Sequence, residues 1–182
     1  MEKIWNLDTY RNVRIWINEY PDIIQSEKTT YKIIHQADTN INWFCGIICM
    51  ELFIAPRAAS NYAMLNMEFV KNDSNQFIAQ YNINKTEGIK IESKISSIND
   101  EVIEGISEEY LECVNELCNK MTDYKLPSGV LNISGGACGK IGTSAMAIRK
   151  VFDIMIKLFA SYYDNDKSDD LIKQLILAEC KK

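Results

Sequence analysis

The sequence predicts an α+β domain in which a mostly antiparallel sheet of five to six strands packs against three to four helices. Two observations predict this class. Apolar residues alternate between positions 31 and 97, with short polar turns between the segments, as in consecutive antiparallel strands. Outside this stretch the apolar residues mostly recur at helical spacing. With 182 residues, 47% of them hydrophobic, the chain is long enough for one core, so we treat 1–182 as a single domain.

An N-terminal helix is predicted over residues 8–20, as an addition to the sheet. Its apolar side chains recur at helical spacing: Tyr10, Val13, Ile17 and Tyr20. Pro21 cannot continue a helix, so the helix is expected to end there. The strands that follow are predicted at these positions: 31–35, 44–54, 63–70, 77–83 and 89–95. The segment 44–54 is almost continuously apolar, which is typical of a strand that is covered on both faces.

The second half of the chain is predicted to be mainly helical. A helix over 107–121 has Ser107 as its N-cap, because a serine hydroxyl accepts a hydrogen bond from a free amide of the first turn. A short strand at 130–133 precedes an apolar, largely buried helix over 143–163. The last predicted element is an amphipathic helix over 168–180, capped by Ser168 with acidic residues in its first turn.

A glycine-rich segment between the strand at 130–133 and the next helix is a candidate ligand site. Its residues are Gly135, Gly136, Gly139, Lys140, Thr143 and Ser144. A nucleotide-binding P-loop needs four residues between its glycines and a hydroxyl directly after its lysine. Only three residues separate Gly135 from Gly139 here, and Ile141 follows Lys140. We therefore favour an architectural role, with glycines that adopt positive φ angles in a tight strand-to-helix connection.

Acidic residues concentrate between positions 100 and 123, where eight of them face a single lysine, Lys120. The whole chain has a net charge of −5, so its acidity is local. Five glutamates form the candidate partner-binding site: Glu104, Glu108, Glu109, Glu112 and Glu116. Four of them follow i,i+4 spacing, which would place them in one stripe if the helix began early. Such a stripe is either a solvated helix face or a docking surface for a basic protein, and it disfavours direct binding of nucleic acid phosphates.

Catalytic and metal-binding patterns are weak. Six cysteines lack a C-x-x-C pair, and we expect them to be free thiols in a cytoplasmic protein. His35 is the single histidine, so neither a zinc site nor a histidine-based catalytic dyad is predicted. No apolar run is long enough to cross a bilayer. The sequence thus predicts a protein that is not an enzyme and has no cofactor, no metal and no membrane partner.

From about residue 31 to 159 the layout resembles domain IV of elongation factor G and the similar ribosomal-protection proteins. The similar segments are the strands at 31–35 and 44–56, the helix start Ser-Glu-Glu-Tyr-Leu at 107–111, and the strand, glycine turn and helix from 130 onward. Gly142-Thr143-Ser144 stands where that family has an Asp-Ser-Ser segment. The resemblance implies a fold with a left-handed βαβ unit.

Two functions follow as expectations. The first is a non-catalytic binding protein whose acidic helix face neutralises a basic protein, as an immunity protein does for a nuclease toxin. The second is a translation-factor-like module that binds the ribosome. A nucleotide-dependent enzyme is a more distant alternative, and a second copy of the chain is a further candidate partner.

Overall fold

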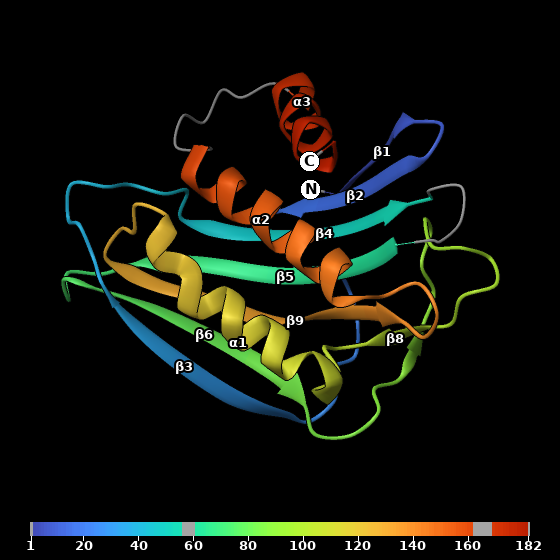
Figure 1. The fold of residues 1–182 in the computed structure, drawn as a ribbon, viewed down its shortest axis with the longest axis horizontal. Coiled ribbons are helices and arrows are strands. Elements are labelled where there is room, and N and C mark those ends of the chain that lie inside the picture. The colour runs from blue at the N-terminus through green and yellow to red at the C-terminus, as the bar shows by residue number, and fades with distance from the viewer. Residues whose placement is uncertain (1, 56–60, 162–168, 182) are drawn as a thin grey trace.

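The fold is α+β, as predicted, in a computed structural model that describes residues 2–55, 61–161 and 169–181 (Figure 1). The described residues form nine strands in one mostly antiparallel sheet. The strands are β1 (Glu2–Asp8), β2 (Arg11–Ile17), β3 (Lys28–Gln36), β4 (Gly46–Ile54), β5 (Asn61–Lys71), β6 (Gln76–Asn84), β7 (Lys90–Ile91), β8 (Val102–Glu104) and β9 (Gly129–Gly139). The helices are α1 (Leu111–Asn119), α2 (Ala145–Ser161) and α3 (Asp169–Cys180), with short 3-10 segments at Glu108–Tyr110 and Lys120–Asp123.

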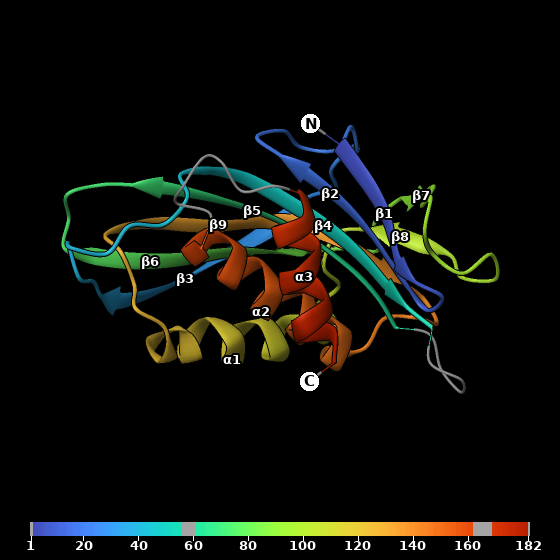
Figure 2. The ribbon, with the colours of Figure 1, turned by 90° about the horizontal axis from the view of Figure 1, so that it is seen from above.

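The sheet order is β1-β2-β4-β5-β9-β6-β3, and β8 joins β7 to the far end of β9. Every neighbouring pair is antiparallel except β6 and β9, which are parallel. Parallel neighbours need a crossover, and here the chain passes through β7, β8 and α1 between them. All three α-helices lie on one side of the sheet (Figure 2). The main core fills the space between the helices and the sheet.

The predicted helix over 8–20 is wrong, because β1 and β2 form an antiparallel hairpin there. Val13 and Ile15 point into the core and pair with Leu52 and Met50 of β4. The apolar positions of this segment fit both a helical and a strand period. The alternation of Val13, Ile15 and Ile17, all β-branched, is the pattern that matches the structure.

The strands predicted at 31–35, 44–54, 63–70 and 77–83 are confirmed, although their bounds differ by a few residues. The predicted strand 89–95 shrinks to two residues, β7. Ser93 explains its early end, because the Ser93 hydroxyl accepts hydrogen bonds from the amides of Ile95 and Ser96 at 3.1 and 2.8 Å. When a serine hydroxyl accepts a hydrogen bond from the backbone amide two residues later, it favours a turn, and the chain then leaves the hydrogen-bonded pairing of the sheet. The strand predicted at 130–133 is longer and absorbs most of the glycine segment.

The helix predicted from residue 107 begins as an α-helix only at Leu111, after a 3-10 turn. Ser107 makes no capping hydrogen bond; its hydroxyl donates to the Glu109 carboxylate at 2.9 Å instead. The predicted helix over 143–163 corresponds to α2, and Ser144 caps it by accepting a hydrogen bond from the Ala147 amide at 3.2 Å. The last predicted helix corresponds to α3. Ser168, its expected cap, lies outside the described residues, as do residues 162 and 163.

The opposite face of the sheet has a smaller buried cluster, which includes Trp16, Tyr62 and Met64. Glu51 is buried there at 2% exposure, and the Tyr62 hydroxyl donates to its carboxylate at 2.8 Å. β4 and β5 are thus covered on both faces, which explains their nearly continuous apolar sequences. Among the described residues, no helix is long and apolar enough to cross a membrane.

Candidate functional site

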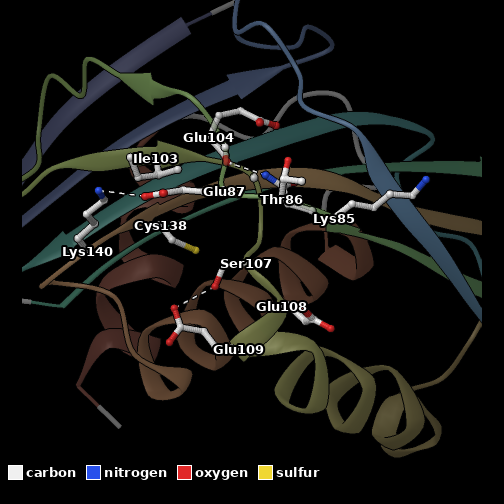
Figure 3. Close-up of a pocket in the computed structure, with 13 residues that line it drawn as sticks. Lys85, Thr86, Glu87, Ile103, Glu104, Ser107, Glu108, Glu109, Cys138 and Lys140 are labelled. Atoms are coloured by element: carbon white, nitrogen blue, oxygen red, sulfur yellow. Dashed lines mark hydrogen bonds and ion pairs between the residues drawn. The ribbon is translucent and has the colours of Figure 1, made fainter.

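A pocket of about 390 Å³ lies between the loop after β6, strand β8 and the start of the α1 region (Figure 3). It brings together residues from both sites that the sequence predicts. Glu104, Glu108 and Glu109 come from the acidic set, and Lys140 comes from the glycine segment. Glu112 and Glu116 do not line this pocket. We take the pocket and the acidic residues beside it as the candidate functional site.

Asn84, the last residue of β6, holds the walls of this pocket together. Its Nδ2 donates to the Glu104 carbonyl at 2.9 Å, and its backbone amide donates to the Ile106 carbonyl at 2.9 Å. The carboxamide lies against Gly105, where a Cβ would come within 2.1 Å of it. Asn84 is 5% exposed, and its Oδ1 accepts no hydrogen bond from the described residues. A buried carbonyl of this kind retains its capacity to accept a hydrogen bond.

Glu104 is a structural residue and does not belong to a helix face. It ends strand β8 and is 2% exposed. Lys28 of β3 forms an ion pair with its carboxylate at 3.0 Å, and the Ser26 amide donates to the other oxygen at 3.1 Å. The predicted i,i+4 stripe that begins at Glu104 is therefore wrong at its first position. The stripe required the helix to begin before residue 107, whereas Gly105 and Ile106 separate β8 from the helical segment.

The exposed carboxylates at the start of the helical segment are Glu108, Glu109 and Glu112, which we call the acidic surface. None of the three forms an ion pair with another described residue. The Glu109 carboxylate accepts a hydrogen bond from the Ser107 hydroxyl, while the Glu108 side chain extends to the opposite side of the segment (Figure 3). Three negative charges within one and a half helical turns repel one another, so a bound cation would reduce this electrostatic repulsion.

Glu116, the last residue of the predicted stripe, is neutralised within the fold. Its carboxylate forms ion pairs with Lys120, at 2.7 Å, and with Arg149 of α2. The hydrogen bonds from Lys120 and Arg149 lower the pKa of Glu116 to about 2. Glu116 therefore links α1 to α2 and offers little charge to a partner.

Lys140 does not have the surroundings of a phosphate-binding lysine. Its Nζ forms ion pairs with Glu101 at 2.9 Å and with Glu87 at 3.0 Å. Hydrogen bonds to the two carboxylates raise the pKa of Lys140. Lys140 thus closes one end of the pocket and compensates Glu87, which the loop after β6 supplies (Figure 3).

The amides of the glycine turn are already occupied by a carboxylate of the chain itself. Asp100 accepts hydrogen bonds from the Ile141 and Gly142 amides, both at 2.9 Å. The Thr143 hydroxyl accepts from the Gly139 amide and donates to the Tyr62 carbonyl, both at 2.7 Å. The turn therefore has the donors expected of an anion site, and Asp100 occupies the place of the anion. These contacts favour the architectural interpretation of the segment.

The expected positive φ angles account for only one of these glycines, Gly135, at +154°. Gly136 and Gly139 lie in β9, where the lack of a side chain permits close packing instead of an unusual turn. A Cβ at Gly139 would come within 2.0 Å of the Asp100 carboxylate. The predicted positive φ angles are therefore wrong for Gly136 and Gly139.

Cys138 lines the pocket, but burial raises the pKa of its thiol to about 12. The thiolate, which is the nucleophile, is therefore scarce at neutral pH. His35 lies elsewhere, and its Nε2 donates to the Cys118 carbonyl at 2.8 Å. No cluster of possible metal ligands occurs among the described residues.

All six cysteines are free, and only Cys45 is exposed. We expect iodoacetamide at neutral pH to modify Cys45 rapidly in the folded protein, because reactivity requires both access and a thiolate. Mass spectrometry should record one fast addition in buffer and six in denaturant. Cys45→Ser should abolish the fast addition, and fast labelling of Cys138 in that variant would contradict the assignment of a buried, protonated thiol.

Several residues of this site were not predicted from the sequence, notably Asn84 and Glu87. The turn that contains Glu87 was recognised, but its position beside Ser107 depends on β6 lying next to β9, which no local pattern reveals. The chain matches no family model, no curated protein and no solved structure, so the site is interpreted from its geometry.

Proposed function

We propose that this chain is a non-catalytic binding protein that holds a basic protein on its acidic surface. The observation that carries this proposal is the contrast among its glutamates. Glu104 and Glu116 are compensated inside the fold, whereas Glu108, Glu109 and Glu112 are exposed and have no ion pair among the described residues. Unpaired charges of one sign accelerate association with a partner of the opposite sign and select for it.

The pocket beside the acidic surface supports the same proposal. Four carboxylates and two lysines line it, and Lys140 is already paired with Glu87. The lining therefore has a net negative charge, and the carboxamide of Asn84 forms part of the pocket wall. A lysine or arginine side chain of the partner would complement this lining, because both are hydrogen-bond donors without acceptors. The acidic surface would then attract the partner, and the pocket would fix one of its cationic side chains.

The chemistry of the remaining groups favours binding over catalysis. The Cys138 thiol has a high pKa, and Asp100 satisfies the amides of the glycine turn. An inhibitor or immunity protein that neutralises a nuclease toxin in the cytoplasm is the form of this function that we propose. Such toxins bind nucleic acid phosphates and present basic surfaces to do so.

A pull-down from the native cells, with two matched variants, tests the proposal. The triple variant E108Q/E109Q/E112Q removes three charges from the acidic surface. The control D22N/D73N/E92Q removes three exposed charges elsewhere, so both variants change the net charge equally. We expect the wild-type chain and the control to retain one basic, stoichiometric protein that high salt releases. The triple variant should weaken that binding by roughly tenfold to a hundredfold, since each removed carboxylate contributes about 0.5–1 kcal/mol.

Equal retention by the triple variant and the wild type would refute the acidic surface as the binding site. If both variants lost binding equally, the net charge of the chain, and not the acidic surface, would account for the binding.

The second candidate is a translation-factor-like module that binds the ribosome; the resemblance to domain IV of elongation factor G implies only the fold of such a module. The observation that favours this candidate is the parallel pair β6 and β9, whose connection contains α1 together with β7 and β8. Ile141 also stands out at the tip of the glycine turn, with 80% of its surface exposed. In the same pull-down, joint recovery of many ribosomal proteins would favour this candidate over the first.

A further inference from the structure

A second pocket, of about 250 Å³, lies on the helical side of the sheet and shares no lining residue with the first pocket. Its walls come from β4 and β5, the first turns of α2 and the end of α3. The walls are largely apolar. They include Leu52, Ala63, Ala147 and Val151, all of which are almost completely buried. A concave apolar site with a few polar groups is the usual form of a small-molecule site.

The two charged residues that line this pocket are both positive. Arg11 and Lys150 line it, and no acidic residue does so among the described residues. One guanidinium nitrogen of Arg11 pairs with Asp8, but Arg11 Nε is buried and has no hydrogen-bond acceptor among the described residues. The Lys150 ammonium donates only to the Cys180 carbonyl, at 3.3 Å, and forms no ion pair within the described part of the chain. A buried donor without an acceptor is costly, and a bound anion would remove that cost.

Cys180 also lines the pocket. Burial raises the pKa of its thiol, the positive charges of Lys150 and Arg11 lower it, and the carboxylates of Asp8 and Glu179 raise it. Both cations are therefore close to the same end of the pocket, although the whole chain has a net charge of −5.

We propose that this pocket binds a small amphipathic carboxylate, with its hydrocarbon part against Leu52, Ala63 and Val151 and its carboxylate near Lys150 and Arg11. A carboxylate fits both cations, since arginine and lysine form charge-assisted hydrogen bonds with it. The volume limits the ligand to a short chain or a single ring. This inference rests on a different part of the molecule from the proposed protein-binding function, and either can fail without the other.

An NMR titration of the full ¹⁵N-labelled chain with hexanoate tests this site. We expect saturable shifts of the Ala63, Ala147 and Lys150 amides at millimolar concentrations. Hexylammonium has the same hydrocarbon chain with the opposite charge and should leave these amides unchanged. Butanoate should bind more weakly than hexanoate by about fourfold for each methylene removed.

Two variants of equal charge separate the pocket from general electrostatics. Lys150→Gln should weaken hexanoate binding by roughly tenfold, which is the loss expected for one charge-assisted hydrogen bond. Lys125→Gln, at an exposed site that does not line the pocket, should leave hexanoate binding unchanged. The proposal is overturned if hexanoate causes no saturable shift, if hexylammonium shifts the same amides equally, or if the two variants weaken binding to the same extent.

Discussion

Glu104→Ala is expected to destabilise the protein by about 3–5 kcal/mol, because it leaves the charge of Lys28 buried without its partner. The Lys28 side chain is 9% exposed and that of Glu104 is 2% exposed, so both charges are largely shielded from solvent. Lys28 would retain only neutral acceptors, Gln25 and the Ser134 carbonyl. In a chain of this length the melting temperature should fall by roughly 6–20 °C, which differential scanning calorimetry measures directly.

Two comparisons show whether the effect comes from the buried charge. The double variant Lys28→Met/Glu104→Leu removes both charges and should recover much of the lost stability, because apolar pairs often replace buried ion pairs at little cost. The ion pair between Glu27 and Lys85 is exposed, so Glu27→Ala should leave the melting temperature nearly unchanged. If Glu104→Ala behaved like Glu27→Ala, the pair would not anchor β3 to β8 as we describe.

The sequence predicted the α+β class because the central strands have unambiguous patterns. Residues 65–69 alternate apolar and polar side chains, and residues 44–54 are apolar except for Glu51, so a strand is favoured at both places. The segment 8–20 was wrongly predicted as a helix because its apolar residues fit both a helical and a strand period. The strand forms because Val13 and Ile15 pair with β4, and this pairing depends on the tertiary fold rather than on the local sequence.

The candidate site was predicted only in part, for a similar reason. Charge counting found Glu108, Glu109 and Glu112, which are indeed exposed, because a local excess of one charge is visible in the sequence. It also included Glu104, whose partner Lys28 is distant along the chain, and Glu116, which pairs with the distant Arg149 as well as with the nearby Lys120. The pairing of such distant charges depends on topology. The positively charged pocket beside Lys150 was missed entirely, because its two cations are separated by more than half of the sequence.

Gly136→Ala is the second substitution from which we expect a large effect, and it tests what the glycine segment is for. A Cβ at this position would lie 1.9 Å from the Met64 carbonyl oxygen and 3.1 Å from the Leu65 Cα, both in the backbone of β5. Strand β5 is fixed between β4 and β9 in the middle of the sheet, so it cannot yield as a flexible side chain would. Overpacking of this kind costs about 1–3 kcal/mol, and we expect the upper end of that range.

Denaturant unfolding gives the stability change, and hydrogen exchange shows where it arises. Gly136→Ala should lower the unfolding midpoint and speed exchange at the Gly105 amide, which donates to the Gly136 carbonyl at 2.8 Å. Ser134→Ala, in the same strand, removes a long hydrogen bond of 3.5 Å to the Asn66 carbonyl and a side-chain contact with the Tyr20 hydroxyl, and should change stability by less than about 1 kcal/mol. A Gly136→Ala variant as stable as the wild type would contradict the architectural role. In that case, the absence of a side chain at Gly136 would have to be explained by a ligand.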